Sequence, residues 1–176
     1  MRARCLARLA AAALALAGLA GCASFSGDGG FAPVEQAAQK HLGKEVRWAR
    51  RDADREAIRD RVAQLLREPL DADAAVQLAL LNNPGLQAAY ESLGIGEAEL
   101  VRAGRLPNPG IGLGRLTRGD ELEWERSLHV DLVALLTLPM RRAIEERRFA
   151  QAQGDAATAV LALAATFAAR AQAALV

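Results

Sequence analysis

Acidic and polar side chains alternate with apolar ones over residues 121–131, and this stretch offers the most chemistry. The odd positions are Glu121, Glu123, Glu125, Ser127, His129 and Asp131. Carboxylates in such a row can donate or accept protons, or attract cations along a wet passage. Catalysis needs a partner group in a defined arrangement, and none is evident near these carboxylates. We therefore predict that this face lines a lumen and favours cations, with a plain solvated strand face as the alternative.

Motifs of the common enzyme and metal-site classes are missing. His41 and His129 lie far apart, and neither has metal-ligand spacing around it. There is no HExxH motif or nucleophile elbow, and the glycines of residues 110–114 lack the spacing and following helix of a nucleotide loop. A net charge of +1 argues against a nucleic-acid footprint. We therefore expect no enzyme activity, no cofactor, no metal site and no nucleic-acid partner.

Cys22 is the residue whose surroundings predict a covalent modification. A start containing Arg2, Arg4 and Arg8 precedes an uncharged run over residues 9–19 that is too short to span a bilayer. Leu19-Ala20-Gly21-Cys22 resembles the bacterial lipobox, in which the cysteine becomes the first mature residue and carries acyl chains such as palmitate. We expect a signal peptide over residues 1–21 and a lipid on Cys22, an ordinary signal peptide being the alternative. Ala23, in place of Asp, favours the outer membrane.

The first part of the mature chain predicts a tether followed by a charged helix. Residues 22–34 are rich in Ser, Gly, Asp and Pro, and we expect the lipidated cysteine to be followed by a flexible tether. Residues 35–68 hold no proline, and Ile58, Val62 and Leu65 follow a helical period. We expect an amphipathic charged helix over 35–68. Its arginines and carboxylates form a solvated face, or else contact anionic lipid or a partner.

Two further helices are predicted by their end signals. Asp71 or Asp73 can cap a helix over 71–81, and Asn83 with Pro84 can cap and start another over 84–103. Gly94 and Gly96 weaken the interior of the second, by about 1 kcal/mol each relative to Ala. They indicate either close approach of a neighbouring backbone or plain tolerance. The prolines at 107 and 109 end this element.

A β-hairpin is predicted over residues 109–132. The pair Gly119-Asp120 suits a two-residue type II′ turn, which sets Ile111 opposite Leu128 and Arg115 opposite Trp124. Arg115 then lies over the Trp124 ring, while Arg126 breaks the apolar face. Each strand has the length of a tilted transmembrane β-strand. The apolar face, which we expect to meet lipid, comprises Ile111, Leu113, Leu122, Trp124, Leu128, Val130 and Leu132.

The last part of the chain predicts one long helix over 139–176. Charged residues fill its first turns, and alanine dominates the rest. The uncharged stretch 156–169 could cross a membrane, but a long alanine-lined packing helix is the preferred interpretation. The apolar face runs to Val176 without a cap, so we expect the chain to be cut short.

The order of these elements resembles the start of the TolC-like outer-membrane efflux channel family, over roughly residues 70–176. The resemblance is carried by Leu80-Leu81-Asn82-Asn83-Pro84-Gly85-Leu86, by Leu106-Pro107-Asn108-Pro109, and by the hairpin and long helix that follow. It implies a mainly α fold whose long helices belong to an α-barrel with coiled-coil packing, plus two strands of an outer-membrane β-barrel. It also implies a homotrimer that works with a periplasmic adaptor and an inner-membrane pump.

The resemblance covers only an incomplete first repeat. Members of the family have two repeats, and each protomer supplies four strands, so three copies of this hairpin give too few for the family's barrel. An open hairpin in lipid also leaves backbone groups unpaired. We expect the N-terminal part of an outer-membrane efflux lipoprotein for metal ions or small toxic compounds. The alternative is a short periplasmic-facing lipoprotein that docks on a partner and forms no pore.

Overall fold

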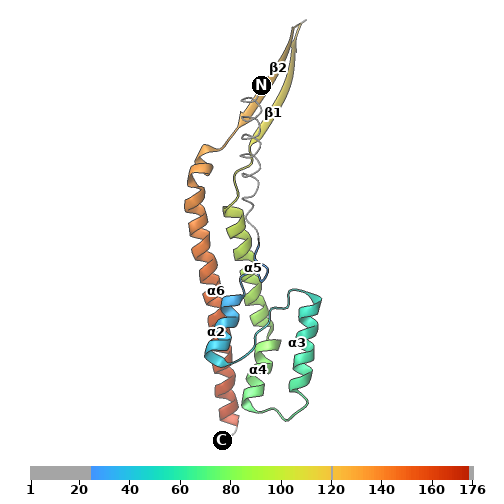
Figure 1. Cartoon of the computed structure of the whole chain (residues 1–176), viewed down its shortest axis with the longest axis vertical. Coiled ribbons are helices and arrows are strands. Elements are labelled where there is room, and N and C mark those ends of the chain that lie inside the picture. Colours follow the sequence, from blue (N-terminus) through green and yellow to red (C-terminus); the bar gives the residue numbers. More distant parts are fainter. Residues whose placement is uncertain (1–24, 120, 175–176) are drawn as a thin grey trace, which may run out of the picture. The chain divides into compact units, whose positions relative to one another are not determined.

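The computed structural model describes residues 25–119 and 121–174, which are mainly helical with one two-stranded antiparallel sheet (Figure 1). The predicted signal peptide and Cys22 lie outside the described residues. The described chain divides into two compact units. The helical unit comprises residues 25–100 together with the chain from residue 143 onward, and the hairpin unit comprises residues 101–142.

Helices α4 (Ala72–Asn82) and α5 (Pro84–Ala103) confirm the predicted helix pair and its end signals. Asp71 Oδ1 accepts a hydrogen bond from the Ala74 amide at 2.6 Å. Asn83 Oδ1 accepts one from the Leu86 amide at 3.1 Å, and Pro84 takes the first helical position. The two caps let one helix end and the next begin within two residues.

One apolar core holds the helical unit together. It draws on α2 (Ala32–Leu42), α4, α5 and α6 (Leu132–Ala174), and on the chain before and after α2. Its members are Phe31, Val34, Ala38, Val46, Trp48, Val76, Leu80, Leu86, Tyr90, Leu93, Ala156, Val160 and Ala164. Phe31 meets Tyr90 edge to face at 4.7 Å between ring centroids. Burial raises the pKa of the Tyr90 hydroxyl, which has no hydrogen-bond partner among the described residues.

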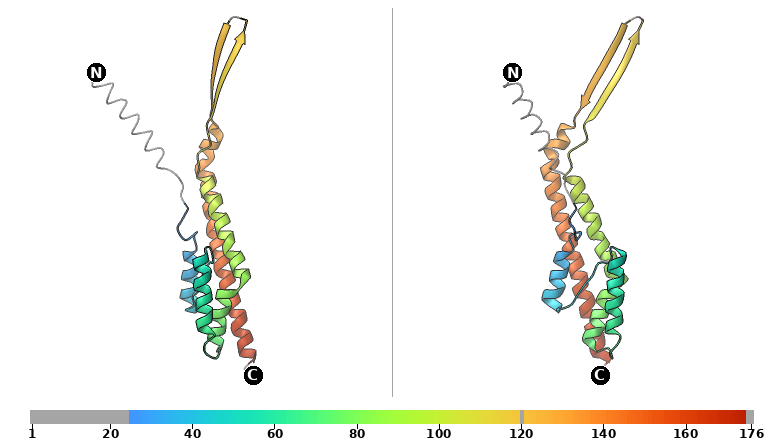
Figure 2. Two further views of the ribbon diagram at one scale, coloured as in Figure 1. Left: turned by 90° about the vertical axis from the view of Figure 1, so that its right-hand side faces the viewer. Right: turned by 45° about the vertical axis from the view of Figure 1, so that its right-hand side comes forward.

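The prediction of one helix over residues 35–68 is wrong. Helix α2 ends at Leu42, and α3 (Asp52–Leu65), which lies beside α4 in both views of Figure 2, begins only at Asp52. Gly43 ends α2 in a left-handed conformation, φ 63°, which glycine adopts without the steric cost of a side chain. Residues 43–51, the strap, run between the helices without regular secondary structure.

Two glutamine side chains supply hydrogen-bond partners to the strap. Gln77 of α4 accepts from the Glu45 amide at 3.0 Å and donates to the Glu45 carbonyl at 2.8 Å. Gln87 of α5 accepts from the Ala49 amide at 2.9 Å and donates to the Arg47 carbonyl at 2.8 Å. Each primary amide therefore serves the strap as a neighbouring strand would, with one donor and one acceptor.

The aromatic side chain of the strap fixes it to α5 as well. Trp48 is buried, and its indole N–H donates to Glu91 Oε1 at 3.0 Å. The Arg50 guanidinium lies 4.8 Å from the centre of the indole ring, within cation–π range. The Val46 side chain joins the core on the same face. Burial of alternate residues explains why a segment this charged packs inward.

The predicted tether over 22–34 extends too far, because α2 already begins at Ala32. Ser26 donates from its amide and its hydroxyl to Glu97 of α5. Asp28 accepts from the Ala32 amide at 2.8 Å and from the Gly30 amide at 3.1 Å, so it caps α2 from four residues upstream. These bonds order the chain before its first described helix.

The glycines of α5 do permit a close approach. A Cβ on Gly96 would lie 3.2 Å from Cδ2 of Phe149 and 3.9 Å from its Cα, and one on Gly94 would meet Trp48 at 3.5 Å. Of the two interpretations offered by the sequence, close approach is the one confirmed at Gly96. Phe149 belongs to α6, so this contact brings α5 and α6 together within the helical unit.

Helix α6 uses its alanine-rich part for packing. Ala156, Val160 and Ala164 are buried in the core at helical spacing. By length and composition alone, the Leu132–Arg170 portion is the one described helix that could cross a membrane. The core contacts of residues 156–164 agree with the preferred interpretation of a packing helix.

Gly30 is the position where a side chain is least tolerable. Its φ is +74°, and an added Cβ would lie 2.2 Å from Cζ of Phe149. Gly43 has a similar φ of +63° but nothing within 4 Å of its Cβ position. We expect Gly30→Ala to lower the free energy of unfolding by about 1–3 kcal/mol more than Gly43→Ala, because overpacking adds to the strain. Urea unfolding followed by circular dichroism measures both, and equal losses would contradict the predicted steric clash.

Asp28 should make stability depend on acid pH. The backbone hydrogen bond from Ala32 is the main cause that lowers the pKa of Asp28 below its ordinary 3.8. The stability that the ionised Asp28 contributes is fully present above the pKa of this group in the unfolded chain. It is lost as pH falls through the lower pKa of the folded state. We expect the stability gap between the parent chain and Asp28→Asn to stay level above about pH 5 and narrow below about pH 4. An equal difference in the free energy of unfolding between the two proteins at every pH in this range would argue against a charged cap.

Candidate functional site

Strands β1 (Gly110–Arg118) and β2 (Glu121–His129) pair in the predicted register. Ile111 faces Leu128, and Arg115 faces Trp124, as a two-residue turn requires. Gly119 has a φ of +63°, which a tight hairpin turn needs at its first position. Asp120 lies outside the described residues, so the turn type stays a prediction.

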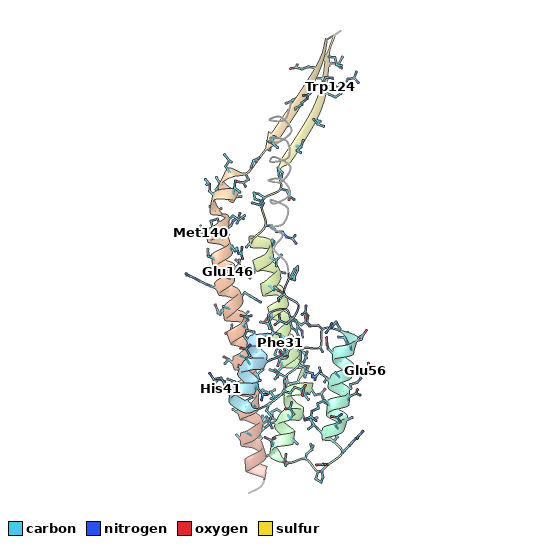
Figure 3. The ribbon with its side chains drawn as sticks, viewed as in Figure 1. Phe31, His41, Glu56, Trp124, Met140 and Glu146 are labelled. Atoms are coloured by element: carbon cyan, nitrogen blue, oxygen red, sulfur yellow. The ribbon has the colours of Figure 1, made fainter. Side chains whose placement is uncertain are left out.

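One face of the hairpin is apolar and uncovered. Alternation along antiparallel strands puts the side chains of Ile111, Leu113, Leu122, Trp124 and Leu128 on this face. All five are exposed, with Leu113 reaching 77% and Trp124 61% (Figure 3). No other described element pairs with or covers the two strands. The hairpin therefore presents to its surroundings a surface that a water-soluble sheet would bury.

Two arginines interrupt the apolar face. The Arg115 guanidinium lies 5.9 Å from the centre of the Trp124 ring, which confirms the predicted contact between them. Arg126 faces Leu113 and is exposed. Long arginine stems can lie along apolar surface while the charged ends reach water or lipid headgroups.

The other face combines acids with glycines. Glu123, Glu125, Ser127 and His129 of β2 lie opposite Leu116, Gly114, Gly112 and Gly110 of β1. A Cβ on Gly112 would lie 2.3 Å from Ser127 Oγ, and one on Gly114 would lie 3.3 Å from Glu125 Cβ. The glycines thus leave room for the side chains of β2 above the backbone of β1. The Glu121 side chain is outside what the structure describes. Leu116, an exposed apolar residue that was not predicted as part of this face, also lies on it.

The predicted face assignments of Val130, Asp131 and Leu132 are wrong, because the strand ends at His129. Asp131 instead begins α6. Its Oδ1 accepts from the Ala134 amide at 2.8 Å, and its carbonyl accepts from the Leu135 amide. Its carboxylate caps a helix and does not extend the acidic row.

The predicted start of the long helix at residue 139 is also wrong. Helix α6 already runs from Leu132, and Pro139 lies inside it. The proline nitrogen cannot donate to the Leu135 carbonyl, which costs the helix one bond. Side chains serve nearby carbonyls: Thr137 donates to Val133 and Arg141 to Ala134. Neither bond reaches the Leu135 carbonyl, and α6 nevertheless continues through the proline.

Ligand sites of the usual kinds are weakly developed elsewhere. A hollow of about 380 Å³ in the helical unit is lined by charged residues that include Arg47, Arg51, Glu45 and Asp54. Its arginines pair with its acids, Arg51 with Asp54 and Arg47 with Glu45. Among the described residues, no three His, Cys, Asp or Glu side chains gather closely enough to hold a metal ion. The hairpin is therefore the candidate functional feature.

The cap at Asp131 can be tested without the membrane. Asp131→Ala and Asp131→Asn both remove the charge, but only Asn retains an oxygen that can cap the helix. We expect the alanine variant to lose about 1 kcal/mol of local stability at the start of α6, and the asparagine variant to lose much less. Amide hydrogen exchange at Ala134 and Leu135 measures this. Equal exchange in both variants would count against the cap.

Comparisons with protein-family models, with curated proteins and with solved structures gave no match to this chain. The hairpin's register, its uncovered apolar face and the packing of the helical unit are thus the observations from which a function must be argued. None of these observations depends on a relative.

Proposed function

We propose that this chain is part of an outer-membrane channel lipoprotein of the TolC-like kind, whose β1–β2 hairpin enters the outer membrane. In this proposal Cys22 carries the lipid, and the long helices contribute to a periplasmic α-barrel. The machine exports metal ions or small toxic compounds together with a periplasmic adaptor and an inner-membrane pump. The fold is mainly helical with a two-stranded sheet, which is compatible with this assignment.

The observation that carries the proposal is the two-faced hairpin. Each strand has nine residues, the lower end of the roughly nine to eleven that a tilted transmembrane β-strand needs. Leu113, Trp124 and Leu128 share an exposed face that water disfavours, while Glu123 and Glu125 share the opposite one. Membrane β-barrels alternate in this way, apolar toward lipid and polar toward the lumen.

The outer edges of the hairpin must be paired for this role. A strand edge in hydrocarbon leaves amides and carbonyls unsatisfied, at several kcal/mol for each group. In the described residues β1 pairs only with β2. The proposal therefore requires strands from further copies, in a homotrimer, or from further polypeptide to close a barrel around the acidic face.

The acidic face supports cations as a class of cargo or counter-ion. Glu123 and Glu125 recur on one face of one strand and would stand in a row along a lumen wall. Carboxylate rings favour cations over anions in aqueous pores. The choice among exported compounds is not encoded in this row.

Opposite faces of β1 provide a matched test of membrane insertion. Leu113→Arg puts a charge on the face assigned to lipid, and Leu116→Arg puts the same charge on the opposite face. We expect the first to disfavour insertion by about 2–4 kcal/mol and the second to have little effect, because lumen-facing positions tolerate charge. The measurement is the fraction of protein that resists urea extraction from outer-membrane vesicles.

Trp124 reports insertion directly. In a Trp48→Phe background it is the remaining tryptophan of the chain. We expect its fluorescence to shift to the blue and to be quenched by lipids brominated in their acyl chains, since the ring would lie in hydrocarbon. Trp124→Phe, which keeps the buried Trp48, is the control and should resist quenching. Water-exposed emission from a lipidated, membrane-bound protein would reject the channel proposal and favour a lipoprotein that docks on a partner without forming a pore.

A further inference from the structure

Ser26 is attached to the helical unit close behind the expected lipid site. Its amide and its hydroxyl both donate to the same carboxylate oxygen, Oε1 of Glu97. Glu97 is only 5% exposed. A buried carboxylate left without donors carries a large desolvation penalty, so the two hydrogen bonds hold Ser26 firmly. We call this pair of bonds the Ser26 pin.

The residues after Ser26 have little slack. The Gly27 carbonyl accepts from the Arg50 guanidinium at 3.2 Å. The Gly30 carbonyl accepts from the Gln153 amide at 2.8 Å, and Gly30 itself leaves no room for a side chain against Phe149. Successive residues from Ser26 onward are thus fastened to α5, to the strap and to α6.

The segment between Cys22 and the Ser26 pin is short. Ser26 follows Cys22 by four residues. Even a fully extended chain covers at most about 14 Å over that number of residues. The Cα of Cys22 must therefore lie within about 14 Å of the Cα of Ser26, whatever conformation the intervening residues adopt. Lipoproteins with long flexible tethers are under no such restriction.

We propose that the Ser26 pin holds the Glu97 end of α5 against the headgroup surface of the membrane, so that the lipid sets the height of the helical unit. The inference rests on the lipid anchor of the proposed function and adds the surface that meets the bilayer. Where the hairpin is not inserted, a loose tether would let the helical unit tumble below the membrane. A pinned one fixes which part of α5 faces the lipid headgroups.

Two alanines on α5 give a matched pair of reporter sites. Ala98 and Ala88 are both exposed, and they stand about 15 Å apart along the helix axis. The sequence contains only Cys5, in the expected signal peptide, and Cys22, which the lipid would occupy. Ala98→Cys and Ala88→Cys can therefore each carry one fluorophore on the full, lipidated chain.

The chain is reconstituted in vesicles of phosphatidylethanolamine and phosphatidylglycerol that contain a lipid with a nitroxide on its headgroup. We expect strong quenching of the label at position 98 and weaker quenching at position 88. Glu97→Ala removes the acceptor of the pin. A ten-residue Gly-Ser insertion after Ser24 keeps the pin. It lengthens the segment between Cys22 and Ser26 to a root-mean-square reach of about 20 Å. The insertion should lower the quenching at position 98 by about half or more, given the longer reach. Glu97→Ala should lower it by less, because the Gly27 carbonyl still accepts from Arg50.

Ser92→Ala is the control, because its hydroxyl bonds only within α5, to the Ala89 carbonyl, and its loss should leave quenching unchanged. Circular dichroism checks that Glu97→Ala is folded, and the insertion variant does not disturb the pin at all. Equal quenching at both label positions, or quenching at 98 that survives both changes, would overturn the inference.

The test separates this inference from the proposed function. The same labels are read in a Leu113→Arg background, which disfavours hairpin insertion but leaves the lipid in place. Quenching at 98 that persists there supports the pin independently of the hairpin, and its loss there overturns the pin. Incorporation of labelled palmitate, abolished by Cys22→Ala, reports the anchor. A chain that incorporates no labelled palmitate would overturn both the lipid anchor and this inference.

Discussion

A chain segment that packs against helices without joining a sheet must still find partners for its amides and carbonyls, because helices satisfy their own backbone internally. The helical unit meets this constraint with side chains. Gln77 and Gln87 each offer one donor and one acceptor to the strap, and Trp48 reaches Glu91. The strap, in turn, places Val46 and Trp48 in the core. Without these bonds the strap would have no fixed position on the helices, and its apolar residues could not be buried in one arrangement.

The N-terminal segment, from Ser26 to Phe31, extends the same arrangement to a third helix. Ser26 bonds to α5, Gly30 bonds to Gln153 of α6, and Phe31 packs on Tyr90. Segments distant in sequence are therefore joined by a few polar contacts around aromatic rings. This explains how a chain with so few aromatic residues builds a core, because three of them, Phe31, Trp48 and Tyr90, lie together in it.

Local signals predicted the hairpin and the α4–α5 pair well. The register followed from a two-residue turn and from alternation, both of which are properties of neighbouring residues. The helix boundaries followed from Asp71 and from Asn83 with Pro84, whose capping roles depend on the first turn alone. Where one residue determines the local backbone conformation, the sequence alone is sufficient to predict it.

The predictions failed where the structure depends on contacts with residues distant in sequence, or where two local signals compete. Ser26 and Glu97 carry no local sign of their contact. Gly43 ends α2, but the charges on both sides resemble one continuous helix face. Pro139 resembles a helix start, whereas Asp131 had already capped the helix eight residues earlier. At the candidate site this shift moved Val130, Asp131 and Leu132 off the strand, while the facing pairs from Ile111 to Thr117 stayed as predicted.

The uncovered hairpin has a consequence for how the protein can exist before it reaches its destination. Both outer edges of β1 and β2 offer unpaired backbone groups in the described chain, and beside them lie Ile111, Leu113 and Leu128. Flat apolar strands with free edges recruit one another into extended sheets. In water, the uncovered strands would therefore favour self-association until other strands or a partner cover them.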